Sequence, residues 1–122
     1  MADILLVEDS PTDAHAYSAI LRSDGHVVRT AVNGEEGIDM ARMHHPDVVL
    51  MDIVMPGVNG FEATRELRRD AETRDIPVII LSTKDQETDR IWGLRQGAID
   101  YLVKPVQRAA LLRSIDSALA SA

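Results

Sequence analysis

The sequence predicts an α/β protein with a doubly wound, five-stranded parallel sheet and five helices on its two faces. Short apolar runs recur along the 122 residues, and each is followed by a segment whose apolar residues recur at helical spacing. Strand and helix therefore alternate five times, which is typical of parallel strands joined by right-handed crossovers. The length suits one domain, and no linker or internal repeat divides residues 1–122.

The first two strands are expected at residues 4–7 and 26–31, which are short apolar or β-branched stretches. Between them, Ser10 can cap a helix whose first position suits Pro11, and Gly25 fits the residue just after its end. The helix after the second strand must end before Pro46, because a residue that precedes proline avoids the helical conformation.

The third strand, residues 48–51, is apolar throughout and is expected to be buried on both faces. Asp52 follows at once, and Pro56, Gly57, Asn59 and Gly60 are turn residues, so this carboxylate lies at a junction between strand and loop. Ligands of open parallel sheets bind just beyond the carboxyl ends of the strands, which makes Asp52 a candidate site residue. The alternative is that Asp52 only caps the loop and the next helix.

The last two strands are expected at residues 78–81 and 99–103. The helix between them, residues 86–96, should turn Ile91 and Leu94 toward the sheet and end at Gly97. The third helix is marked by Phe61, Ala63, Thr64 and Leu67, and the last helix carries Leu111, Leu112, Ile115 and Leu119 on one side.

Composition excludes several classes of function. The net charge is -7 without a basic run, which argues against nucleic-acid binding, and the 45% apolar content argues against disorder. The chain has no cysteine, so disulfides and cysteine metal sites are excluded. The first residues have no basic region and only a four-residue apolar run, which excludes a signal peptide or membrane span there. We expect a soluble cytoplasmic protein.

Polar residues stand at the ends of four predicted strands, namely Glu8, Asp9, Asp52, Ser82 and Lys104. Each has an ordinary explanation alone, as a helix cap, a turn residue or a solvated lysine. Together they point to a site, because three carboxylates at one edge repel each other unless a cation neutralises them. Oxygen ligands without histidine or cysteine favour Mg²⁺, and a lysine and a hydroxyl suit a phosphate. This combination suggests an aspartyl-phosphate intermediate.

Over its whole length the chain resembles the receiver domain of two-component response regulators. The matching elements are Glu8-Asp9, Asp52, Met55-Pro56-Gly57, Ser82, Gly97-Ala98 and Lys104-Pro105. Residues 51–61 and 82–89 look most like the single-domain regulators of chemosensory systems that control twitching motility by type IV pili. The resemblance implies the flavodoxin-like receiver fold with strand order 2-1-3-4-5.

The resemblance also implies the roles of site residues. Asp52 would accept a phosphoryl group from a chemosensory histidine kinase. Asp9, Asp52 and the backbone carbonyl of Val54 would bind Mg²⁺ directly, with Glu8 acting through water, although the family often has Asp at this position. Lys104 would contact the phosphoryl group, and the Lys104-Pro105 peptide bond is expected to be cis.

The signal would pass through Ser82, the switch hydroxyl, and Tyr101, the aromatic residue that follows it. We expect a monomer whose unidentified protein partner binds the face formed by the fourth helix, fifth strand and fifth helix. Trp92 belongs to this face or simply packs on a neighbour, and Tyr101 could be an ordinary strand aromatic. Val54 and Lys84 are expected to tune hydrolysis of the phosphoryl group.

Two other functions compete with this prediction. A Mg²⁺-dependent aspartyl-phosphate phosphohydrolase would need a second acid two residues after Asp52, where Val54 cannot transfer a proton. A flavin carrier would need a phosphate cradle after the first strand, where the two acids Glu8 and Asp9 repel phosphate. Turnover of an organic phosphate would distinguish the enzyme from the signalling domain.

Overall fold

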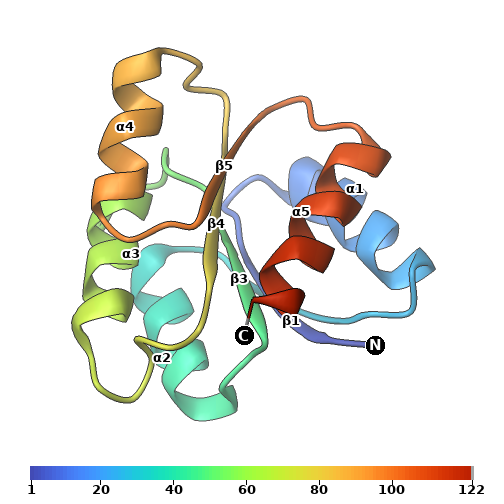
Figure 1. Cartoon of the computed structure of the whole chain (residues 1–122), viewed down its shortest axis with the longest axis horizontal. Helices are drawn as coiled ribbons and strands as arrows, with labels where there is room; N and C mark the ends of the chain where they lie inside the picture. Colours follow the sequence, from blue (N-terminus) through green and yellow to red (C-terminus); the bar gives the residue numbers. More distant parts are fainter. Residues whose placement is uncertain (122) are drawn as a thin grey trace.

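The computed structural model describes residues 1–121 and confirms the doubly wound parallel sheet, with strand order β2-β1-β3-β4-β5 (Figure 1). The strands are β1 (Asp3–Val7), β2 (Val27–Ala31), β3 (Val48–Met51), β4 (Val78–Ser82) and β5 (Asp100–Val103). The helices are α1 (Pro11–Ser23), α2 (Gly34–His44), α3 (Gly60–Arg69), α4 (Glu87–Arg95) and α5 (Arg108–Ala120).

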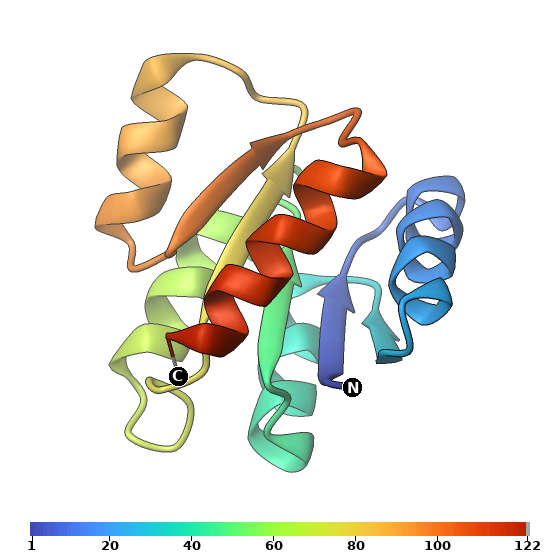
Figure 2. The same cartoon turned by 45° about the vertical axis from the view of Figure 1, so that its right-hand side comes forward.

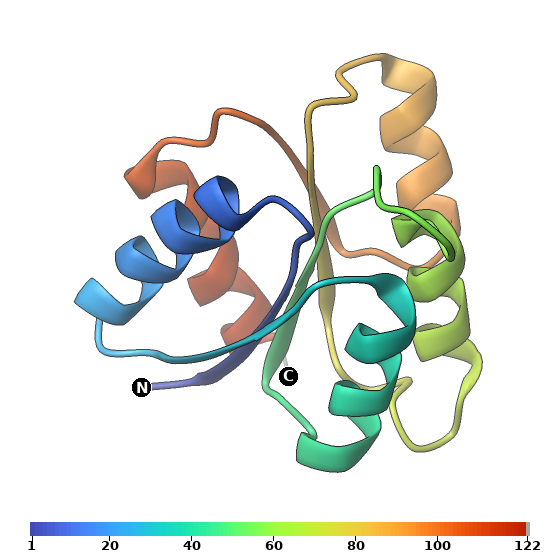
Figure 3. The same ribbon diagram turned by 180° about the vertical axis from the view of Figure 1, so that it is seen from behind.

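The core has two layers, one on each face of the sheet, because successive strand side chains point to opposite faces. Leu50 of β3 packs in the cluster beneath α1 and α5, whereas Met51 packs in the cluster beneath α2 and α3. Figure 3 shows α1 and α5 on one side of the sheet and α2, α3 and α4 on the other. All four β3 residues are buried, as expected for a central parallel strand.

Side-chain caps fix the starts of three helices. The side chains of Ser10, Asn33 and Asn59 accept hydrogen bonds from backbone N–H groups in the first turns of α1, α2 and α3. Pro11 is the first residue of α1, and Gly25, just beyond that helix, has a φ of 86° that favours glycine. These positions agree with the sequence-based expectations.

The prediction for the inward face of α4 was wrong at Ile91. This side chain is 42% exposed and Leu94 is only partly buried, while Gly93 is the buried residue of the helix. A Cβ atom on Gly93 would lie 2.7 Å from Cδ1 of Ile80 and 3.1 Å from the ring of Tyr101. The helix approaches the sheet through a residue without a side chain, and this rotates Ile91 outward.

The carboxyl ends of the strands lie along one edge of the sheet. Figure 2 shows the arrowheads of β1, β4 and β5 pointing toward the same edge, at which the loops to the following helices begin. The strand-end residues predicted to form a site therefore do reach a common edge. Within residues 1–121, none of the helices is both long and apolar enough to span a lipid bilayer.

Candidate functional site

Asp52 lies at the centre of this edge, directly after β3. Its backbone N–H donates to the carbonyl of Val7 at 3.0 Å, and the residue as a whole is only 6% exposed. The first residue of α3 packs on its backbone, since a Cβ atom on Gly60 would lie 2.0 Å from the Asp52 carbonyl oxygen. Only glycine fits there, so the start of α3 and the position of Asp52 are fixed together.

The two acids after β1 differ in exposure. Glu8 is 2% exposed, and its Oε2 accepts a hydrogen bond from the Ser10 N–H at 3.1 Å, whereas Asp9 is exposed. One carboxylate oxygen from each of Glu8, Asp9 and Asp52 lies within 4.8 Å of the others. The structure thus brings together the three carboxylates predicted to form the metal site.

Lys104 lies among carboxylates at the end of β5, and its side chain is almost fully buried. Its Nζ donates to Glu8 Oε1 and to Asp13 Oδ2, the latter at 2.9 Å, and lies 3.9 Å from Asp52 Oδ1. The peptide bond to Pro105 is cis, as expected. The sequence analysis missed Asp13. The one feature of the sequence that could have indicated Asp13 is its spacing of four residues from Asp9. This spacing puts it in the first turn of α1, beside this edge.

The electrostatics of the site are unbalanced around Asp52. Burial and, after it, the charge of Glu8 raise the pKa of this carboxyl from 3.8 to about 7, although Lys104 opposes both effects. Burial alone would lower the pKa of Lys104, but its hydrogen bonds to Glu8 and Asp13 and the charge of Asp52 outweigh burial and raise it. The lysine is therefore firmly protonated, yet it does not fully compensate the carboxylates.

This donor set fits a hard divalent cation. Its ligand atoms are carboxylate oxygens, which Mg²⁺ prefers, and no histidine belongs to the cluster. The raised pKa of Asp52 shows that its ionised form lacks a sufficient counter-charge in the folded protein. A cation at Glu8, Asp9 and Asp52 would supply that charge.

Ser82 and Tyr101 lie in contact with the same loop after β4. The Ser82 Oγ accepts a hydrogen bond from the Lys84 N–H at 3.2 Å, and the Tyr101 hydroxyl donates to the Lys84 carbonyl at 2.7 Å. Tyr101 is buried, and burial followed by the charge of Asp89 raises its pKa to about 12. The Tyr101 hydroxyl is thus protonated and donates a hydrogen bond, and the side chain points into the protein in this structure.

A hollow of about 390 Å³ lies beside Asp52, between the loops that follow β3 and β4. It is lined by Ile53, Val54, Met55, Asn59, Phe61 and Lys84. Val54 and Lys84, the residues two positions after Asp52 and Ser82, therefore share one space next to the candidate site. Val54 is exposed there and contributes an apolar, branched surface.

Another cluster, formed by Asp24, His26 and Asp116, also has ligand atoms within 4.8 Å of one another. The His26 Nδ1 accepts a hydrogen bond from the Ala2 N–H at 3.1 Å, so the imidazole proton is assigned to Nε2. That nitrogen faces Asp24 Oδ2 at 3.4 Å and has no lone pair for a metal in this tautomer. The cluster is better explained as a buried histidine beside an acid.

Comparison with known proteins gives a family and close relatives. The sequence model described as "Response regulator receiver domain" matches residues 4–116. Protein PilH of Pseudomonas aeruginosa is 60% identical over 120 residues, which cover 98% of this chain and 99% of that protein. The transcriptional regulatory protein AfsQ1 of Streptomyces coelicolor is 40% identical over 111 residues, 91% of this chain but 48% of that relative.

Solved structures agree with this result. The receiver domain of the sensor histidine kinase PA1611 from Pseudomonas aeruginosa, with a magnesium ion coordinated in its active site cleft, is 36% identical, with a TM-score of 0.91 and 98% of both chains covered. The chemotaxis protein CheY4 of Vibrio cholerae is 31% identical with a TM-score of 0.91, covering 98% of this chain and 99% of its own.

Proposed function

Because the chain belongs to the response regulator receiver domain family, we propose that Asp52 accepts a phosphoryl group from a histidine kinase. The observation that carries this proposal is the convergence of Glu8, Asp9 and Lys104 on Asp52 at the sheet edge. We further propose that the protein acts in the chemosensory control of twitching motility. This part is supported by the 60% identity with PilH and by the sequence stretches 51–61 and 82–89.

The proposed reaction is a phosphoryl transfer between side chains. A carboxylate oxygen of Asp52 attacks phosphorus, the bond from phosphorus to the kinase imidazole nitrogen breaks, and the electron pair leaves with that nitrogen. Lys104, which lies 3.9 Å from Asp52 Oδ1, offers its ammonium group to the incoming phosphoryl oxygens. The buried position of Asp52 keeps competing water away from the carboxylate.

Mg²⁺ is the proposed cofactor, held by Asp9, Asp52 and the backbone carbonyl of Val54, with Glu8 acting indirectly. Both oxygens of Glu8 already accept hydrogen bonds, from Lys104 and from the Ser10 N–H, which supports an indirect role. When bound, Mg²⁺ would neutralise negative charge on the carboxylates and on the phosphoryl oxygens.

The signal would be a change in the protein's own surface. Phosphoryl oxygens would attract the Ser82 hydroxyl away from the Lys84 N–H, and the loop that holds the Tyr101 hydroxyl would move with it. The inward Tyr101 described above would be one state of this switch. The proposed protein partner binds the face of α4, β5 and α5, where Ile91 and Val103 are exposed, whereas Trp92 lies on the α3 side of α4.

Mass spectrometry after incubation with acetyl phosphate and Mg²⁺ tests the proposal. The protein should gain one phosphoryl group that hydroxylamine removes, and the Asp52→Asn variant should gain none. Asp75→Asn, which changes an exposed carboxylate elsewhere, is the matched control and should be labelled like the wild type. Labelling that persists in Asp52→Asn would overturn the assignment.

The competing phosphohydrolase is not favoured, because Val54 offers no proton at the position where such an enzyme needs an acid. We propose instead that the protein hydrolyses no external phosphate and that its own phosphoryl group is lost slowly. A steady-state assay with an organic phosphate and Mg²⁺ distinguishes the two functions, since repeated turnover would favour the enzyme. A cytoplasmic location and a monomeric state stay predictions, and sedimentation velocity checks the second.

A further inference from the structure

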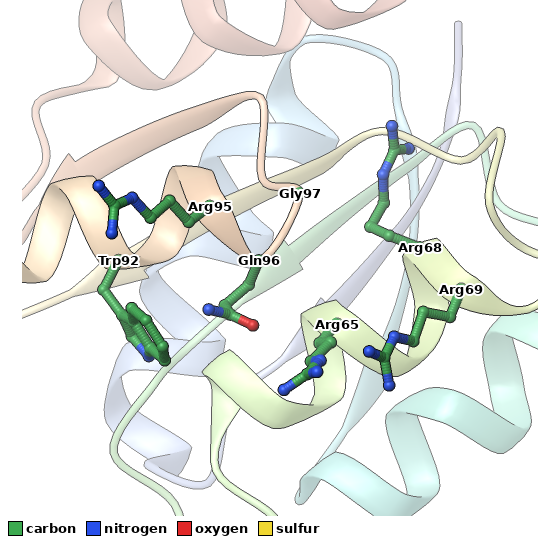
Figure 4. A pocket seen from close by; sticks show the side chains of 7 residues that line it. All are labelled: Arg65, Arg68, Arg69, Trp92, Arg95, Gln96 and Gly97. Atoms are coloured by element: carbon green, nitrogen blue, oxygen red, sulfur yellow. The ribbon is translucent and has the colours of Figure 1, made fainter.

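A groove between α3 and α4 gathers basic side chains on an otherwise acidic protein. It has a volume of about 490 Å³ and is lined by Arg65, Arg68, Arg69, Trp92, Arg95, Gln96 and Gly97 (Figure 4). Four of the chain's 13 lysine and arginine residues therefore line one groove, although the net charge is -7. We call this feature the arginine groove.

Within the described part of the chain, three arginines of the groove form no ion pair, although Glu62 and Glu66 lie beside Arg65 and Arg69 on α3. Over residues 1–121, no carboxylate oxygen lies within 4.0 Å of a guanidinium nitrogen of Arg65, Arg69 or Arg95. The acids of α3 are engaged elsewhere, since Glu62 accepts from the Asn59 side chain at 2.9 Å and Glu66 lies 3.6 Å from Arg42.

Helix position explains only part of this arrangement. Arg69 and Arg95 lie in the last turns of α3 and α4, where a cation is favourable. Arg65 lies one turn earlier, and like charges four residues apart, at Arg65 and Arg69, destabilise a helix. An indole that is 49% exposed at Trp92 is not explained by helix position either.

The floor of the groove is rigid, and its opening is accessible. Arg68 donates to the Ile76 carbonyl at 3.0 Å, and its stem lies against Gly97, where a Cβ atom would approach Arg68 Cγ to 2.6 Å. Figure 4 shows Trp92 and Arg65 extending toward the same open side from opposite helices. Trp92 and Arg65 are thus accessible to a partner, and Arg68 beneath them is fixed by its hydrogen bond and its contact with Gly97.

We propose that the arginine groove docks an acidic segment of a partner protein. Guanidinium groups pair with carboxylates through two parallel hydrogen bonds, and arginine and tryptophan are the residues that dominate protein interfaces. Pockets for small ligands are lined mainly by apolar side chains, whereas here Trp92 is the single large apolar residue of the lining. The lining therefore favours a protein segment that carries several Asp or Glu side chains.

Trp92 is the only tryptophan of the chain, so its fluorescence reports directly on the groove. Titration with a synthetic hexaglutamate peptide at low ionic strength should change this fluorescence in a saturable way, and added salt should weaken the binding. The Arg65→Gln/Arg69→Gln variant should bind roughly threefold to tenfold more weakly, as expected for the loss of two exposed ion pairs.

The Arg74→Gln/Arg113→Gln variant loses the same charge at exposed positions outside the groove and should bind like the wild type. Circular dichroism verifies the fold, and Arg95→Gln, on the other helix, replaces the α3 variant if that variant does not fold. Equal weakening in the control, or no saturable change, would overturn the proposal. Tighter binding of inorganic pyrophosphate than of hexaglutamate at matched ionic strength would also overturn it, because the groove would then be a phosphate site.

Discussion

Replacement of Asp52 by Asn should stabilise the metal-free protein at neutral and alkaline pH. Asp52 ionises near pH 4 in the unfolded chain but near pH 7 in the folded protein, because burial and Glu8 disfavour its charge. A raised carboxyl pKa gives stability that is complete below the unfolded value and is lost as the pH rises through the folded value. The wild type should therefore lose stability between about pH 4 and pH 7, and the Asp52→Asn variant should lack this loss.

The size of the effect follows from the two pKa values. A rise from 3.8 to about 7 corresponds to about 4 kcal/mol at about 1.4 kcal/mol per pKa unit, which is the upper limit for the gain at pH 8. Because an amide only approximates a protonated carboxyl, we expect about 2–4 kcal/mol, or about 8–16 °C in Tm for a domain of this size. The gap between variant and wild type should widen by about 2.5 kcal/mol from pH 5 to pH 8.

Urea denaturation in EDTA at pH 5 and pH 8, followed by circular dichroism, measures this gap. Asp75→Asn removes one exposed carboxylate and reports the effect of net charge alone. Added Mg²⁺ should narrow the gap at pH 8, because a ligand of the folded wild type stabilises it. The reasoning fails if Asp52→Asn is no more stable than wild type at pH 8, or if its advantage is the same at both pH values.

Four further substitutions test the site. Asp9→Ala should weaken Mg²⁺ binding by at least about tenfold in calorimetric titration, and unchanged affinity would mean that the metal site is misplaced. Asp13→Asn should leave Mg²⁺ binding intact but slow phosphorylation by acetyl phosphate, because Lys104 loses one of its two hydrogen-bonded carboxylates; an unchanged rate would argue against a positioning role. Val54→Asn should shorten the lifetime of the phosphorylated state, because an apolar shield becomes polar, and equal decay rates would place the water path elsewhere. Ser82→Ala should still be phosphorylated but show smaller amide chemical-shift changes around Tyr101, and shifts identical to those of wild type would refute the coupling.

The location of the site could be predicted because it depends only on chain direction. Parallel strands end at one edge, so residues at the carboxyl ends of β1, β3, β4 and β5 had to come close to each other. The partner of Lys104 could not be predicted in the same way. Whether this side chain reaches Asp13 depends on how far it extends past the ends of β3 and β4, which lie between β1 and β5 in the sheet.

Packing between helices was less accessible to sequence reasoning. The inward face of α4 was assigned from apolar side chains, but the contact is made at Gly93, whose lack of a side chain allows the close approach. The arginine groove escaped notice for another reason. Its residues lie on two helices about thirty positions apart in the sequence, and only the packing of α3 beside α4 brings them together.

Chain direction also polarises the domain electrically. Because every helix follows a strand, all five helices begin at the Asp52 edge and end near the opposite edge. Each helix start carries about half a positive elementary charge and each end about half a negative one. The backbone therefore produces a field along the strand direction that attracts anions, such as a phosphoryl donor, to the edge where Asp52 lies. No side-chain substitution reverses this field, since its sign is set by the topology of the chain.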